Sequence, residues 1–256
     1  KAAYFLTILL VVAQSSCLYA ATAAPTLHKF SGLELGYGTF SFAEKLDHKL
    51  VFPVVSLSAG LAYQRFSYVL NISGSLSNAD VSEEEQFGHA SRQDVDFTVG
   101  YQLNKLTSIF AGYKTGETKL SLIARDPVTN NSGNEKYKQS GPYLGVNMNW
   151  AIPDAGKIAF SVAYAVLNAD NVYVDDGDGV GVGETREFDD ISGKNNGDTT
   201  GYSFSLGWTM PIKGSLLFRS RLKVNQYKQD IRYDGVNYNN ISESSTMLLV
   251  GVTNIF

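Results

Sequence analysis

From residue 31 to the last residue of the chain, apolar and polar side chains alternate in segments of about ten residues. In the first segment, Leu33, Leu35 and Tyr37 alternate with Glu34 and Gly36. Successive side chains of a β-strand point to opposite faces, so this period of two predicts strands with one apolar and one polar face. The segments lie at residues 31–41, 51–63, 66–75, 94–101, 108–114, 144–150, 158–166, 202–208, 216–225 and 245–256. The pattern predicts an all-β chain of about ten strands.

The links between these segments are by turns short and long. The second and third segments, for example, are joined only by Gln64 and Arg65, which predicts a hairpin. Long polar links are predicted at 78–91, 116–138, 169–199 and 229–244, and the first link, at about 42–50, is intermediate. Strict alternation with both chain ends on the short-link side is typical of an antiparallel transmembrane β-barrel, and a soluble sandwich has no reason to produce it.

Aromatic side chains gather at both ends of the apolar faces. Beside the short links lie Tyr63, Phe66, Tyr101, Trp150, Trp208 and Phe256. Toward the long links lie Tyr37, Tyr113, Tyr164 and Tyr202. Two aromatic girdles at the membrane interfaces are therefore expected. The alternative is a soluble barrel of lipocalin type with these side chains pointing inward, which leaves the alternation of link lengths unexplained.

Length and composition argue against several other classes of protein. A length of 256 residues suits a single large barrel. One cysteine and a net charge of -4 indicate neither a disulfide framework nor a nucleic-acid partner. The mean hydropathy of -0.10 argues against a helical membrane protein, whereas barrel strands expose apolar side chains to lipid only at alternate positions. We expect no cofactor and no metal.

The first residues have the order of a secretory signal. Lys1 precedes an apolar run from Ala2 to Ala13, and small residues follow. Ala21-Thr22-Ala23 offers a cleavage site, so we predict a signal at 1–23 and a single barrel domain at 24–256. Cleavage after Ala20 is the earlier alternative.

The last segment, Ser245 to Phe256, has an apolar row that ends in Phe. In this respect the chain resembles the bacterial outer-membrane β-barrel family. The resemblance implies a location in the outer membrane, short turns in the periplasm and long loops outside the cell. It further implies contact with outer-membrane lipids and lipopolysaccharide, and recognition of the C-terminal strand by the barrel assembly machinery.

Charged residues of both signs lie on the polar faces. They are Glu34, Asp94, Asp96, Lys114, Arg219, Arg221 and Lys223. Unpaired charges inside a narrow barrel are costly, so we predict a lumen charge network in which these groups pair. About ten strands is only slightly above the eight at which side chains fill the interior, which favours a filled lumen. A charged constriction in a narrow pore is the alternative.

Two short motifs resemble those of barrel enzymes. Asp94-x-Asp96 resembles the paired aspartates of the omptin proteases, but that family also needs an Asp-His dyad, and none of the three histidines lies in the later strands. His89-x-Ser91 resembles the lipid A deacylases, but it falls in a predicted polar loop. We therefore expect a non-enzymatic barrel that acts through surface loops, with a loop-bound partner, or as a structural barrel. A narrow solute channel is the first alternative, and a lipid A-modifying or proteolytic enzyme is the second.

The predicted loop 169–199 is rich in carboxylates. Asp176-Gly177-Asp178-Gly179 could offer oxygen ligands to calcium. Its spacing does not match an EF-hand, and a solvated acidic loop is the favoured interpretation.

Overall fold

The computed structural model describes residues 27–42, 50–82, 86–124, 132–175, 193–233 and 236–256. The predicted signal at 1–23 and the candidate calcium ligands at 176–179 lie outside these residues. The regular structure of the described residues is β-strand. Within these ranges, no helix is long and apolar enough to cross a membrane.

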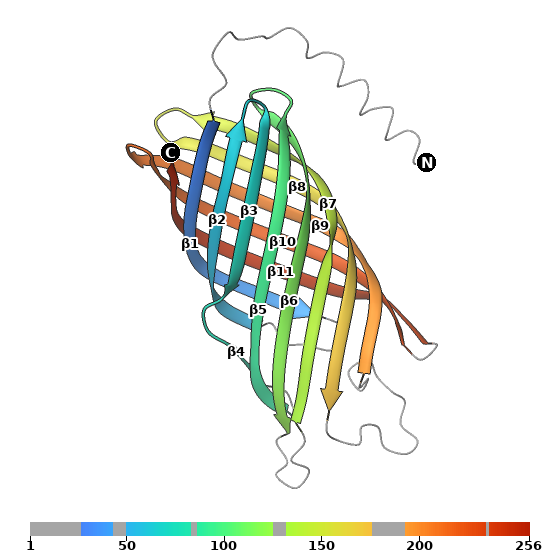
Figure 1. Ribbon diagram of the computed structural model, residues 1–256. Coiled ribbons are helices and arrows are strands. Elements are labelled where there is room, and N and C mark those ends of the chain that lie inside the picture. Colours follow the sequence, from blue (N-terminus) through green and yellow to red (C-terminus); the bar gives the residue numbers. More distant parts are fainter. Residues whose placement is uncertain (1–26, 43–49, 83–85, 125–131, 176–192, 234–235) are drawn as a thin grey trace, which may run out of the picture.

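The described residues form one sheet of eleven strands that closes on itself (Figure 1). The strands are β1 (Leu27–Phe42), β2 (Leu50–Tyr63), β3 (Phe66–Ser75), β4 (Ala79–Ser82), β5 (Gln86–Gln102), β6 (Thr107–Ala124), β7 (Ser132–Ile152), β8 (Gly156–Asp175), β9 (Gly193–Lys213), β10 (Leu216–Tyr233) and β11 (Val236–Ile255). Antiparallel pairing of β1 with β11 closes the barrel. Because β3 and β4 both pair with β5, they make one interrupted barrel strand, and the barrel has ten. The predicted all-β, antiparallel, ten-stranded barrel is confirmed.

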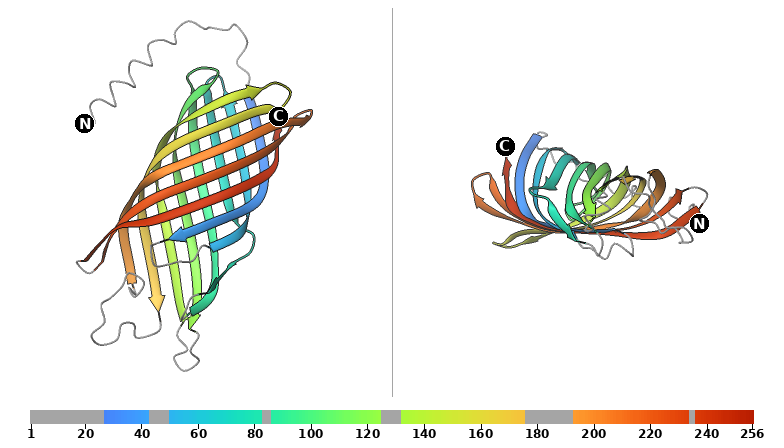
Figure 2. Two further views of the ribbon diagram at one scale, coloured as in Figure 1. Left: turned by 180° about the vertical axis from the view of Figure 1, so that it is seen from behind. Right: turned by 90° about the horizontal axis from the view of Figure 1, so that it is seen from below.

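The strands on one side of the barrel are much longer than predicted, and the predicted loops are correspondingly too long. The predicted loop 116–138 is mostly strand, since β6 runs to Ala124 and β7 begins at Ser132. The same holds at 78–91 and 229–244, where strands continue to Ser82 and Tyr233. At 169–199, β8 continues to Asp175 and β9 begins at Gly193, and the residues between them lie outside the described part of the chain. The left view of Figure 2 shows these strands continuing downward, well past the point at which β1 ends.

A change in the outward face explains the error. Along β6 the outward side chains are apolar up to Tyr113 and then become Thr115, Glu117 and Lys119. The apolar row stops because side chains beyond the membrane meet water. Backbone pairing nevertheless continues past this point. We call the strand segments beyond the girdle of Tyr37, Tyr113, Tyr164 and Tyr202 the extension. Their inward neighbours remain buried, as Thr118 and Leu120 show.

An apolar belt surrounds the barrel between the two aromatic girdles. Its outward side chains are exposed in the isolated chain; Leu144, for example, is 59% exposed. At the extension side, the rings of Tyr164 and Tyr202 lie 5.2 Å apart. Such a belt is the lipid-facing surface of a transmembrane barrel.

The other end, which we call the short-turn end, carries the second set of aromatic residues. Phe66 and Tyr101 pack with their rings 5.1 Å apart across β3 and β5. Trp208 packs on Phe218 at 5.7 Å, and its indole nitrogen donates to the backbone oxygen of Ala155 at 2.7 Å. Tyr63, Trp150 and Phe256 are exposed on the outer wall of this end.

Candidate functional site

The lumen holds the groups that sequence analysis singled out, and Glu34 of β1 is the most deeply buried of them, with 1% exposure. Arg221 donates from Nη2 to Glu34 Oε2 at 2.5 Å and to Ser56 Oγ at 3.2 Å. Arg219 Nε lies 3.6 Å from Glu34 Oε1. One carboxylate therefore serves two guanidinium groups.

A glycine permits this contact between strands that are not neighbours. Gly251 of β11 lies in register with Glu34 on one side and Arg219 on the other. A Cβ at Gly251 would meet Glu34 Cα at 2.6 Å and Leu33 O at 2.0 Å. Glycine in a strand often marks such a close approach. Here it leaves the space across which the β1 and β10 side chains meet.

Asp96 lies in a second cluster, in which a glycine again leaves room for contact between strands that are not neighbours. It accepts hydrogen bonds from Thr98 Oγ1 at 2.9 Å and Tyr143 Oη at 2.6 Å, and Lys223 Nζ lies 3.8 Å from Oδ2. Tyr143 reaches β5 from β7 over Gly112 of β6, where a Cβ would meet the tyrosine ring at 2.3 Å. The aromatic ring thus covers the glycine of the neighbouring strand.

Asp94 has a different partner, Arg92, which sequence analysis did not single out. Arg92 donates to Asp94 from Nε at 3.0 Å and from Nη2 at 2.8 Å, a bidentate pair. It also donates to Thr118 Oγ1 at 2.9 Å and lies 4.5 Å over the ring of Phe40. Arg92 was missed because it follows directly on a predicted loop.

Lys114 is the last member of the predicted network. Its ammonium donates to Tyr227 Oη and lies 4.2 Å from the centre of that ring. Tyr227 is in turn hydrogen-bonded to Ser203 at 2.7 Å. The seven predicted residues therefore divide among several clusters and do not form one continuous chain of ion pairs.

A further polar cluster lies inside the extension, around Glu243. Tyr137 Oη donates to Glu243 Oε2 at 2.7 Å. The side-chain amide nitrogens of Gln139 and Gln229 each donate both to Tyr137 Oη and to Glu243 Oε2. Burial raises the pKa of Glu243, and burial together with the neighbouring Glu243 raises the pKa of Tyr137. Tyr137, Gln229 and Glu243 lay in predicted loops, and Gln139 lay directly after one. The period-two order Tyr137, Gln139, Gly141, Tyr143 was the signal that could have found them.

Apolar side chains fill the lumen beside this cluster. The buried set is Phe40, Leu50, Phe52, Val54, Ala79, Val81, Ala90, Leu120, Tyr137, Ala169, Met247 and Leu249. Burial also differs along the inward face of β10: the side chains of Arg219, Arg221 and Lys223 are 27%, 13% and 28% exposed. The whole residues Asn225, Tyr227 and Gln229 farther along are 4%, 2% and 0% exposed. The inward side chains of β10 are therefore more buried inside the extension than beside the Glu34 cluster.

The two enzyme-like motifs do not come together. His89 and Ser91 lie in strand β5, not in the predicted loop, and His89 Nδ1 is 3.2 Å from Asp80 Oδ1 on the outer wall. Asp94 and Asp96 are on the opposite, inward face of the same strand, because faces alternate along it. The histidine and the aspartate pair are thus separated by the wall of the barrel.

Neither a protein-family model nor a curated protein sequence matches the chain. Among solved structures it is similar to the outer membrane protease OmpT from Escherichia coli, with a TM-score of 0.57, 10% identity, and coverage of 94% of this chain and 100% of that chain. It is also similar to the translocator domain of the autotransporter NalP from Neisseria meningitidis, with a TM-score of 0.47, 11% identity, and coverage of 99% and 96%.

The likeness to OmpT shows a shared fold, and at this identity it shows the fold alone. The chain therefore has the fold of bacterial outer-membrane β-barrels. Together with the apolar belt and its two aromatic girdles, this fold places the protein in the outer membrane, as the sequence predicted.

Proposed function

We propose that this protein is a non-enzymatic outer-membrane barrel with a closed lumen, which acts through its extension and surface loops or as a structural barrel. The observation that carries the proposal is the difference in burial along β10, between the partly exposed Arg219 and Lys223 and the fully buried Gln229. Ions entering from the short-turn end would meet the Tyr137–Glu243 cluster and the apolar side chains beside it. Moving an ion through such a region without hydration is costly.

The extension is the second support for this function. Its outward face is polar, and Glu117 binds Lys119 Nζ at 3.1 Å and Lys136 Nζ at 3.0 Å there. Long paired strands hold these groups in fixed positions beyond the membrane. A rigid polar surface of this kind suits a loop-mediated partner outside the cell, and its lysines suit the phosphates of lipopolysaccharide.

A narrow channel is the second candidate, and one observation favours it. Arg219 and Lys223 remain partly exposed in the short-turn half of the lumen, as the lining of an anion pathway would be. An enzyme is the third candidate. It has less support, because Asp94 and Asp96 are engaged by Arg92 and Tyr143, and His89 faces the outer wall.

An efflux assay tests the proposal. Vesicles loaded with chloride and a chloride-sensitive dye, and carrying the purified barrel, should release chloride at the rate of protein-free vesicles. Release that grows with the amount of folded barrel would favour the channel instead. Proteolysis of a fluorescent peptide library, or a mass change of lipid A on overexpression, would favour the enzyme.

As the family resemblance implies, we also propose that the assembly machinery of the outer membrane recognises the C-terminal strand. β11 has a particular place in the closed barrel, because it pairs with β1 along thirteen aligned residue pairs, from Phe30–Ile255 to Phe42–Glu243. Phe256 extends this pairing through reciprocal backbone hydrogen bonds of 2.9 Å with Lys29. Replacing Phe256 with Ala should reduce the folded fraction in cells, seen as loss of the faster-migrating band on unheated gels.

A further inference from the structure

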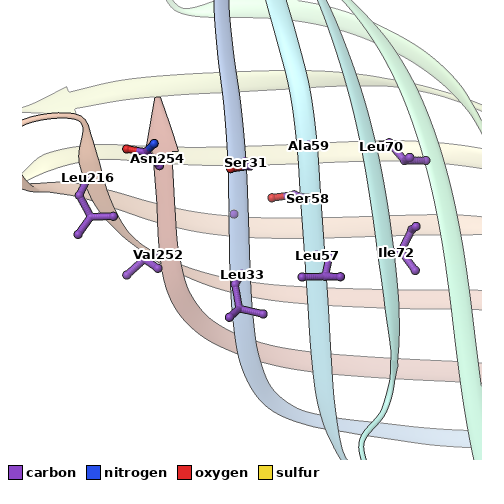
Figure 3. Close-up of a pocket in the computed structure, with 11 residues that line it drawn as sticks. Ser31, Leu33, Leu57, Ser58, Ala59, Leu70, Ile72, Leu216, Val252 and Asn254 are labelled. Carbon is purple, nitrogen blue, oxygen red and sulfur yellow. The ribbon is translucent and has the colours of Figure 1, made fainter. Parts of the chain in front are cut away.

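The lipid-facing wall has a hollow of about 410 Å³ on the side where the barrel closes. Its floor is a row of small or polar side chains, Asn254, Ser31 and Ala59, which the register aligns across β11, β1 and β2. A second row, farther from the short-turn end, forms a raised apolar edge. That edge consists of Val252, Leu33, Leu57 and Ile72 (Figure 3). Leu216 and Leu70 close the two ends of the floor, because they align with Asn254 and Ala59.

The position of this hollow determines its surroundings. Leu33, Leu57 and Ile72 are 44%, 53% and 46% exposed on the outer wall, within the apolar belt. The floor lies only one outward row from Lys29, close to the short turns. The hollow is thus at the depth where acyl chains meet the glycerol esters of the periplasmic leaflet.

The polar groups of the floor fit an ester. Ser215 Oγ donates to Asn254 Oδ1 at 2.6 Å, which leaves the amide NH₂ of Asn254 as a hydrogen-bond donor. Ser31 offers a hydroxyl beside it, in register. Ester carbonyl oxygens accept hydrogen bonds and cannot donate them, so two adjacent donors complement a diacylglycerol backbone.

The short-turn end supplies the complementary charge. Its described residues include the cations Lys29, Arg65, Lys105, Lys157 and Lys213, against the acidic side chain of Asp154. Two of these cations border the hollow: Lys29 lies one outward row from Ser31, and Lys213 aligns with Leu216. Both are exposed, so both can meet a phosphate at the membrane surface.

We propose that this hollow is a binding site for one anionic phospholipid of the periplasmic leaflet. An acyl chain fills the floor under the Leu33 and Leu57 edge, the glycerol esters accept from Ser31 and Asn254, and Lys29 and Lys213 hold the phosphate. The volume lies within the range of small-molecule sites, about 300 to 1,000 Å³. This site is independent of whether the lumen conducts, so its test and the efflux assay can fail separately.

Native mass spectrometry of the folded full-length barrel in detergent tests the site, with palmitoyl-oleoyl phosphatidylglycerol as the probe and the matching phosphatidylcholine as the comparison. The wild type should retain one phosphatidylglycerol more tightly than any further copies. Ala59→Trp fills the floor and should weaken that first binding at least 10-fold. Ala111→Trp is the matched control, because it adds the same side chain to the outer wall at β6, away from the hollow, and should leave binding unchanged.

A second pair of variants tests the headgroup contacts. Lys29→Ala and Lys213→Ala should each weaken phosphatidylglycerol binding roughly 5-fold and change phosphatidylcholine binding little. Ser31→Leu replaces Ala59→Trp if that variant does not give the heat-modifiable band of a folded barrel. Equal binding by the Ala59 and Ala111 variants would overturn the proposal. A wild-type dimer that Ala59→Trp dissociates would also overturn it and would make this face an interface between two copies.

Discussion

Arg221 Nη2 lies 2.5 Å from Glu34 Oε2, although 187 positions separate the two residues in the sequence. Closure of the barrel brings them together, since β1 and β10 are both neighbours of β11. Glu34 also lies 3.6 Å from Arg219, so the removal of this carboxylate affects two cations at once.

Replacing Glu34 with Ala should lower the free energy of unfolding by about 3 to 5 kcal/mol, because two guanidinium groups would remain in the lumen without their carboxylate. Urea unfolding in lipid vesicles measures this change. Lys105→Ala, in an exposed turn, should stay within about 0.5 kcal/mol of the wild type. Equal losses in the two variants would mean that the Glu34 cluster does not stabilise the barrel.

Gly251→Ala should destabilise the barrel by about 1 to 3 kcal/mol, because the new methyl group meets backbone atoms of β1 that cannot rotate away. Gly207→Ala is a matched control, since the nearest atom to its Cβ is Ser220 O at 3.7 Å, an ordinary contact. Both glycines face the lumen, so a difference between the variants reports the close approach. Equal melting temperatures of the two heat-modifiable bands would contradict this explanation.

Arginine at Val146, within the belt, should cost about 2 to 4 kcal/mol because it places a charge in lipid. Arginine at Ser140, on the same outward face of β7 but in the extension, should cost about 0 to 1 kcal/mol. Unfolding from vesicles compares the two. A large loss of unfolding free energy for arginine at Ser140 would show that the membrane boundary lies within the extension.

Stability should depend on pH through Glu243, which lies in the extension. Burial raises its pKa, so the folded chain holds a proton that the unfolded chain releases as the pH rises above the ordinary value of 4.5. The stabilising contribution is therefore complete below that pH and is lost as the pH rises through the raised pKa. Glu243→Gln removes the titration, and its advantage over the wild type should grow with pH across this range. A constant difference in unfolding free energy would contradict the assignment.

The strands were predictable where lipid imposes an apolar row, as at Leu144, Val146 and Met148 of β7. They were not predictable at the start of β7, where Lys136 and Lys138 face water and Tyr137 and Gln139 face the polar Glu243 cluster. On this part of β7 the two faces differ in burial and not in polarity, so a pattern of apolar residues cannot detect the strand. The cluster around Glu243 was missed for that reason.

The proximity of Glu34 to the β10 cations follows from strand order and could be inferred from the sequence. The pairing of Asp94 with Arg92 and the contact of Tyr143 with Asp96 could not. Tyr143 reaches Asp96 only because Gly112 leaves its ring room, and Arg92 turns back to Asp94 within one strand. Such contacts depend on side-chain direction and register, which the alternation of residue types does not specify.

Single-channel recording in planar bilayers tests the closed lumen most directly. The purified, folded wild type should give no steady conductance. Phe52→Ala combined with Tyr137→Ala removes bulk from the buried part of the lumen, so this double variant should conduct steadily. A steady wild-type conductance whose anion selectivity is lost in Arg221→Ala would contradict a closed lumen, because the cations would then line an open pore.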